Sequence, residues 1–111
     1  MDNNYVLITG ASSGIGYELA KLFKRDGYNL ILVARNKERL KIASDRLKDK
    51  ESKIIMLDVD LSKEEEIDKL IRFINENKIE VDIIILLSCR GHYDDKWLEK
   101  FFVSYFSIKK Y

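Results

Sequence analysis

Proline is absent from this chain of 111 residues, and cysteine and histidine occur once each. The single cysteine, Cys89, has no second cysteine for an internal disulfide, which favours a reducing, cytoplasmic location. Cys89 and His92 lie close in sequence, but a tetrahedral zinc site needs further ligands. We therefore expect neither a disulfide nor a metal site.

An excess of charge of either sign is also lacking. Twenty basic residues face 19 acidic ones, which leaves a net charge of +1 and no electrostatic footprint for nucleic acid. The longest apolar run, residues 81–87, is interrupted by Asp82 and is far too short to cross a bilayer. No repeat or linker divides the sequence, so we expect one domain over residues 1–111 with neither nucleic acid nor membrane as partner.

Apolar runs alternate with amphipathic segments along the chain. The runs are apolar on both faces, as in parallel strands that are covered by helices on each side. The sequence therefore predicts an α/β fold with strands at Tyr5–Thr9, Asn29–Ala34, 53–58 and 81–87, and helices at 15–26, 37–50 and from Ser62 onward.

The expected helices carry capping signals and apolar stripes. Gly27 suits the left-handed position after the first helix, and Ser62 with Glu65 is typical of a capping box at the start of the third. The predicted stripes are Ile15, Leu19, Leu22 and Phe23 in the first helix, Leu40, Ala43 and Leu47 in the second, and Ile67, Leu70, Ile71 and Ile74 in the third.

A glycine-rich turn, residues 9–16, joins the first strand to the first helix. Gly10 permits a tight turn, Gly14 removes a side chain where main chain would approach a pyrophosphate, and Gly16 allows close packing of helix on sheet. The first amides of the helix would then face an anion. The alternative interpretation is a glycine turn that only caps a helix.

The sequence of this turn, Thr-Gly-Ala-Ser-Ser-Gly-Ile-Gly, resembles the glycine motif of the short-chain dehydrogenase/reductase family. The resemblance is good over residues 4–85 and poor over 86–111. It implies a Rossmann-like sheet in the strand order 3-2-1-4, with the cofactor at its carboxyl edge. The cofactor-binding residues implied for the turn are Thr9, Gly10, Ser12, Ser13, Gly14, Ile15 and Gly16.

Arg35 follows the second strand, where a carboxylate would bind the ribose 2′-hydroxyl of NAD. A guanidinium can instead hold a 2′-phosphate through charge-assisted hydrogen bonds, so the sequence favours NADP(H) over NAD(H). In the family a second basic residue often precedes the middle glycine, where this chain has Ser13. Arg35 as a plain surface charge is the alternative. Lys37 and Arg39 could assist, but lysines and arginines on a helix surface are usually only solvated.

Asp58 and Val59 end the third strand. The resemblance implies that the carboxylate of Asp58 accepts a hydrogen bond from the adenine amine and that the Val59 amide helps read the ring. A strand-end aspartate that caps the following turn is the competing interpretation.

The resemblance fails after the fourth strand. Leu86, Leu87, Ser88 and Cys89 stand where the family has Asn-Asn-Ala-Gly, and Ser104 stands where a catalytic asparagine is usual. The family's catalytic serine and Tyr-x-x-x-Lys pair belong to a half that this sequence lacks. Two chance matches, Tyr17 with Lys21 and Tyr105 with Lys109, are in the wrong helices, so no catalytic residue is assigned. The loss of resemblance at Leu86 suggests a reading frame that is truncated, frameshifted or deliberately cut.

The expected function is the NADP(H)-binding portion of a short-chain oxidoreductase that transfers hydride between nicotinamide and a carbonyl or alcohol, without catalytic competence of its own. The alternative is a non-catalytic nucleotide-binding or self-associating module. An open sheet edge and the apolar residues Trp97, Leu98, Phe101, Phe102 and Phe106 would then favour a homodimer or larger oligomer. A stable fold without retained function is the third possibility.

Overall fold

The computed structural model describes residues 4–87, with the exception of 13 and 62. The predictions for Ser13, for Ser62, for the Cys89–His92 pair and for the apolar segment 97–106 lie outside this part of the chain. The elements in order are β1 (Tyr5–Thr9), α1 (Gly14–Arg25), β2 (Asn29–Ala34), α2 (Lys37–Leu47), β3 (Ile54–Asp58), α3 (Glu64–Glu76) and β4 (Val81–Ile85).

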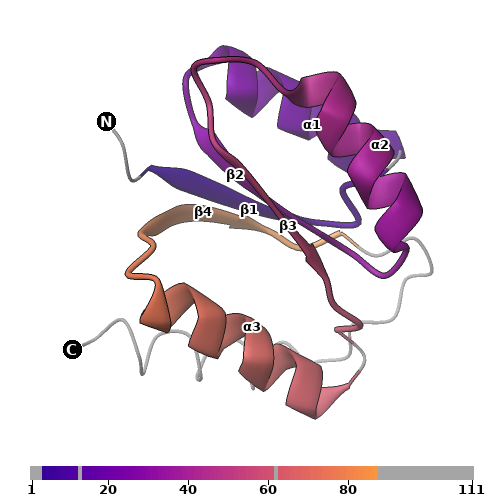
Figure 1. The fold of residues 1–111 in the computed structure, drawn as a ribbon, viewed down its shortest axis with the longest axis vertical. Coiled ribbons are helices and arrows are strands. Elements are labelled where there is room, and N and C mark those ends of the chain that lie inside the picture. The colour runs from indigo at the N-terminus through magenta and orange to yellow at the C-terminus, as the bar shows by residue number, and fades with distance from the viewer. Residues whose placement is uncertain (1–3, 13, 62, 88–111) are drawn as a thin grey trace.

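The four strands form one parallel sheet in the order β3-β2-β1-β4, which confirms the predicted fold. Helices α1 and α2 cover one face of the sheet and α3 covers the other (Figure 1). This arrangement follows from right-handed crossovers, because the chain steps one way across the sheet through α1 and α2 and back through α3.

The sheet separates two apolar clusters, so β1 and β2 are buried on both faces. The α1-face cluster lies under α1 and α2, and the α3-face cluster lies under α3. The α1-face cluster comprises Val6, Ile8, Ala11, Ala20, Leu30, Leu32, Ala34, Leu40 and Leu47. The α3-face cluster comprises Tyr5, Leu7, Ile31, Val33, Leu61, Ile67, Leu70, Ile71, Ile74 and Val81.

A bulge at Asp82 determines toward which face of the sheet each later side chain of β4 points. Tyr5 pairs with Val81, but Val6 pairs with Ile83, so Asp82 is an extra residue in the β4 strand and is exposed. Such an insertion reverses the alternation of side chains beyond it. Ile83, Ile85 and Leu87 therefore pack against the α1-face cluster, whereas Ile84 and Leu86 pack against the α3-face cluster.

The predicted apolar stripes of α2 and α3 are confirmed, since all seven of their residues are buried. The stripe of α1 is partly wrong, because Ile15 is 71% and Leu22 is 46% exposed. The buried residues of α1 are Gly16 and Ala20. These small residues let the helix lie close to the sheet, and the larger Ile15 and Leu22 point away from it.

The helix ends confirm one prediction from the sequence and correct another. Gly27 has a φ of +92°, the left-handed conformation expected after α1. Helix α2 ends at Leu47 rather than near residue 50, because Lys48 is already extended.

Ser62 lies outside the described residues, but the N-cap of α3 is Lys63, one residue later than the capping box at Ser62 and Glu65 predicts. Helix α3 begins at Glu64 after Lys63, which caps it without a side-chain hydrogen bond. Glu66 occupies the third helical position, and its carboxylate accepts a hydrogen bond from the Asp60 N–H at 3.5 Å.

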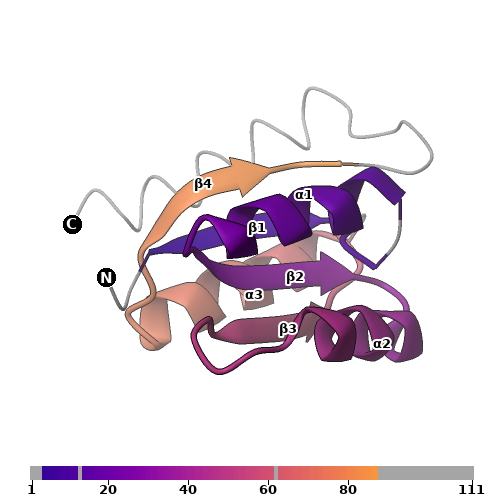
Figure 2. The same cartoon turned by 90° about the horizontal axis from the view of Figure 1, so that it is seen from above.

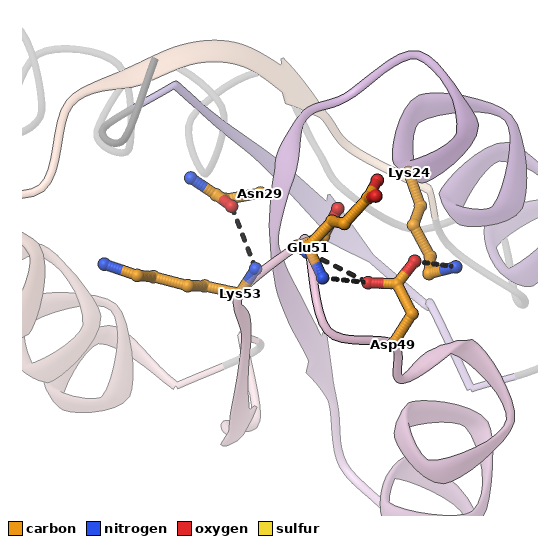
Figure 3. A network of polar contacts seen from close by, with 6 residues as sticks. Lys24, Asn29, Asp49, Glu51 and Lys53 are labelled. Atoms are coloured by element: carbon orange, nitrogen blue, oxygen red, sulfur yellow. Dashed lines mark hydrogen bonds and ion pairs between the residues drawn. The ribbon is translucent and has the colours of Figure 1, made fainter.

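A polar network links the connection between α2 and β3 to α1 and β2 (Figure 3). The carboxylate of Asp49 accepts hydrogen bonds from the N–H groups of Glu51 and Ser52, both at 2.9 Å. Its other oxygen lies 2.6 Å from the Lys24 ammonium on α1. Next along the chain, the buried Asn29 side chain accepts from the Lys53 N–H at 2.9 Å. The start of β3 is thereby fixed to α1 and β2.

The Lys24 ammonium, followed by the N–H groups of Ser52 and Glu51, lowers the pKa of Asp49 from 3.8 to about 2. A carboxyl group whose pKa is lowered by folding stabilises the fold above its ordinary pKa and loses this effect as the pH falls. The contribution of Asp49 is thus complete above about pH 4 and disappears between 3.8 and about 2.

We therefore expect Asp49→Asn to lower the urea midpoint of unfolding at pH 7, and the gap from the wild type to narrow as the pH falls from 4 toward 2. Equilibrium urea denaturation at several pH values measures this gap. Asp45→Asn is the matched control, because Asp45 is exposed on α2 and forms no ion pair within residues 4–87 as described. A gap that stayed constant with pH would contradict the role given to the Asp49 charge.

Candidate functional site

The carboxyl ends of the four strands meet at one edge of the sheet, and Figure 2 shows all four arrows pointing to it. In the strand register Thr9 pairs with Val33, and Ala34 pairs with Asp58. The glycine turn after β1, Arg35 after β2 and Asp58 at the end of β3 therefore lie at the same edge. Ligands of open parallel sheets bind at such an edge.

The glycine turn depends on backbone conformations and contacts that side chains would disturb. Gly10 has a φ of +63° and turns the chain away from β1, as predicted. Gly14 has a φ of +61°, and a Cβ atom placed there would meet no other atom within 4 Å. The position of Gly14 is exposed, so open space lies where the predicted pyrophosphate would approach.

Gly16 lets α1 pack closely, as the sequence predicted, but against the main chain of Gly10 and Ala11 rather than against the sheet. A Cβ atom at Gly16 would lie 2.3 Å from the Gly10 carbonyl oxygen and 3.0 Å from the Ala11 Cα. The first turn of α1 thus packs on the main chain of the glycine turn itself. The positive end of the α1 dipole therefore lies at this turn, where it favours an anion.

Thr9 fastens the end of β1 to the segment after β4. Its buried hydroxyl donates to the Leu87 carbonyl at 2.9 Å and accepts from the Leu87 N–H at 2.7 Å. Beyond it, the Ala11 N–H donates to the Val33 carbonyl at 3.4 Å, which joins the turn to β2. Both hydroxyl bonds of Thr9 are therefore directed at protein main chain.

Leu87 is a residue of the site that the sequence did not indicate. The sequence pattern marked it only as a departure from the family, because its contact with Thr9 uses main-chain atoms. Residue types do not reveal such a contact in advance.

Arg35 is exposed directly after β2 and forms no ion pair or hydrogen bond through its side chain with any described residue. The next residue, Asn36, caps α2, and its side chain accepts from the Arg39 N–H at 3.0 Å. Lys37 and Arg39 are exposed on the first turn of α2. The guanidinium of Arg35 is thus available to an anionic ligand at the carboxyl edge.

Asp58 and Val59 differ in what they offer a ligand. Asp58 is exposed, and its carboxylate has no partner within the described part of the chain. The Val59 N–H already donates to the Ala34 carbonyl at 3.1 Å. This bond occupies the amide that was expected to help read an adenine ring, so the adenine prediction depends on the carboxylate of Asp58.

The remaining residues of the predicted site have simpler surroundings. Ser12 is half-buried in the turn, and Ile15 is exposed on the first turn of α1. Among residues 4–87, leaving aside 13 and 62, no three His, Cys, Asp or Glu side chains gather as metal ligands. No helix in this same part of the chain has the length and apolar character needed to cross a membrane.

Comparisons with known proteins agree with the fold. The sequence model of the short chain dehydrogenase family matches residues 4–100. An 11-beta-hydroxysteroid dehydrogenase B of Sesamum indicum is 44% identical over 77 residues, which is 68% of this chain and 20% of that protein. The chain spans 20–36% of the length of curated relatives such as this one and an oxidoreductase of Staphylococcus aureus.

Solved structures give the same result. A short chain dehydrogenase from Bacillus anthracis superposes with a TM-score of 0.71 at 30% identity, over 78% of this chain and 35% of that one. The L-sorbose reductase of Gluconobacter frateurii, solved in complex with NADPH and L-sorbose, superposes with a TM-score of 0.72 at 26% identity. That match covers 97% of this chain and 48% of the reductase.

The contact at Gly16 predicts the effect of adding one methyl group. In an ordinary helix, replacing glycine by alanine is favourable by about 1 kcal/mol. At Gly16 the methyl group would overlap the Gly10 carbonyl, so we expect Gly16→Ala to lower the free energy of unfolding by about 3 kcal/mol. Urea denaturation of both proteins measures the difference.

Gly14→Ala is the matched control. The methyl group has open space there, and only the left-handed φ is unfavourable, by about 1–2 kcal/mol. We expect Gly14→Ala to be clearly more stable than Gly16→Ala. The reverse order would show that the helix can move away from the turn at little cost.

Proposed function

We propose, because this chain belongs to the short-chain dehydrogenase/reductase family, that it binds NADP(H) at the carboxyl edge of its sheet. It would serve as the cofactor-binding part of an oxidoreductase. When bound, the nicotinamide group supplies a hydride to a carbonyl, or takes one from an alcohol. The residues of this chain bind and orient the cofactor.

The observation that carries the proposal is the geometry of the glycine turn. Three glycines bring main chain and the start of α1 together without side chains, and Gly14 leaves an open approach to the helix amides. A dinucleotide presents a pyrophosphate, which suits such a cradle in both charge and shape. A glycine turn that only capped a helix would have no need of an exposed, left-handed Gly14 with open space above it.

Arg35 supports NADP(H) over NAD(H). Its guanidinium is exposed and without a partner in the described residues, at the strand end where NAD-binding proteins have a carboxylate for the ribose hydroxyl. The L-sorbose reductase that resembles this chain was solved with NADPH. Charge-assisted hydrogen bonds to a 2′-phosphate contribute about 1.5–3 kcal/mol each, about tenfold to a hundredfold in affinity.

The proposal assigns the chain cofactor binding and no proton transfer. The family's proton donor is the tyrosine of a Tyr-x-x-x-Lys pair, and Tyr17 with Lys21 is the match to that pattern within the described residues. Both are on α1, where Lys21 lies 5.7 Å from the centre of the Tyr17 ring and 3.4 Å from the Glu18 carboxylate. We give neither a catalytic role.

A second candidate function, self-association, is favoured by the outer side of β4. Within residues 4–87 as described, β4 pairs with β1 alone, and its residues Ile83 to Ile85 are apolar and only half-buried. A strand edge of this kind is a template for pairing with a second chain. We propose a homodimer formed through this edge as the alternative role.

The proposed function predicts a strong cofactor preference that depends on Arg35. We expect the full chain to quench or shift NADPH fluorescence on binding, with weaker binding of NADH. In Arg35→Asp the carboxylate would repel the 2′-phosphate, so NADPH affinity should fall at least about tenfold while NADH affinity changes little. Fluorescence titration with both cofactors measures the two affinities.

Arg72→Asp is the control, because it makes the same change of charge at an exposed position of α3. We expect it to retain the preference for NADPH. Equal binding of NADPH and NADH by the wild type would remove Arg35 from the site. No binding of either cofactor to a folded chain would reject the proposed function itself.

The dimer predicts a mass that depends on concentration. We expect size-exclusion chromatography with light scattering to show a dimer as the concentration rises, because the unpaired edge of β4 can pair with a second copy of the chain. A wild-type chain that remains monomeric at the highest concentration tested would reject the edge as an interface.

A further inference from the structure

We propose that Leu87 is a positioning residue for the glycine turn. Its side chain packs against the α1-face cluster. This packing holds the main chain of Leu87 in place, and Thr9 and Gly10 contact that main chain. This inference deepens the proposed function, because it concerns the same cofactor site. It assigns a role to the position where the sequence departs from the family pattern.

The first support is the set of main-chain contacts at Leu87. Its N–H and carbonyl both bond to the Thr9 hydroxyl, at 2.7 and 2.9 Å. A Cβ atom placed at Gly10 would lie 3.2 Å from the Leu87 carbonyl oxygen and 3.7 Å from the Leu87 Cβ. The first two residues of the turn are therefore fitted against one residue of the segment after β4.

The second support is the face on which the side chain lies. The bulge at Asp82 places Leu87 on the α1 face, where it packs against the cluster that includes Ala11 and Ala20. Ala11 is a fully buried residue of the turn, and Ala20 lies on α1. Leu86 is the neighbouring residue but packs against the α3-face cluster, on the other side of the sheet.

These contacts explain how the turn tolerates the loss of the family's Asn-Asn-Ala-Gly segment. The amide side chains of that segment would stabilise the turn by hydrogen bonding, whereas a leucine can stabilise it only by burying apolar surface. Because the bonds to Thr9 use main-chain atoms, they survive the change of side chain. Packing of Leu87 then fixes the main chain that makes those bonds.

Leu87→Ala and Leu86→Ala test the proposal as a matched pair. Both remove the same atoms from half-buried leucines, but only Leu87 lies on the face of the turn. The readout is hydrogen exchange of the Ala11 and Leu87 amides, measured by NMR on the full chain without cofactor. We expect exchange at these amides to be about tenfold faster in Leu87→Ala than in Leu86→Ala. NADPH affinity should fall about tenfold in Leu87→Ala alone.

Leu87→Met should retain slow exchange, because it keeps apolar bulk at the same place. Equal exchange in the two alanine variants would overturn the proposal whether or not the chain binds NADPH. If only Leu87→Ala loses slow exchange and no variant binds NADPH, the positioning role would be supported and the proposed function would be rejected.

Thr9→Val and Thr9→Ser provide a second test if Leu87→Ala does not fold. Valine keeps the shape of threonine without its hydroxyl, so exchange at the Leu87 amide should accelerate, and serine should restore slow exchange. No difference between valine and serine would overturn the proposal.

Discussion

The rest of the site depends on the contact of main chain with main chain between Gly16 and Gly10. A side chain at Gly16 would lie within 2.3 Å of the Gly10 carbonyl oxygen, so the helix and the turn occupy space that only glycine leaves free. The contact holds the start of α1 at the carboxyl edge of the sheet. It also explains why α1 buries Gly16 and Ala20 and turns Ile15 and Leu22 to solvent.

The sheet supplies a second constraint, the alternation of side chains between two clusters. In β1 and β2 this alternation is regular, and both strands are buried throughout. In β4 the extra residue Asp82 shifts it by one position, which moves a charged side chain to solvent and returns the isoleucines to apolar surroundings. The same shift decides that Leu87, and not Leu86, lies beside the glycine turn. A local feature at the start of the strand thus determines the contacts at its end.

Much of this architecture could be predicted from the sequence, because continuous apolar runs mark strands that are buried on both faces. The bounds of β1 and β2 and the strand order were correct. The errors arose where a choice between neighbouring positions depends on tertiary contacts. Helix α2 ends at Leu47 rather than near residue 50, and α3 is capped by Lys63, one residue after the Ser62 that the sequence predicts. The role of Leu87 involves main-chain atoms, which residue types do not report.

The charges left at the carboxyl edge bear on which ligand fits. In the register of β2 and β3, Ala34 pairs with Asp58, so Arg35 and the Asp58 carboxylate follow neighbouring strands. They form no ion pair with each other. An ion pair between two exposed groups would contribute little in water, so a ligand could bind both groups without losing a strong contact. A simple anion would satisfy Arg35 but be repelled by Asp58. A nucleotide that directs a phosphate to the guanidinium and an amine-bearing ring to the carboxylate would satisfy both, which is the pattern of an adenosine 2′-phosphate.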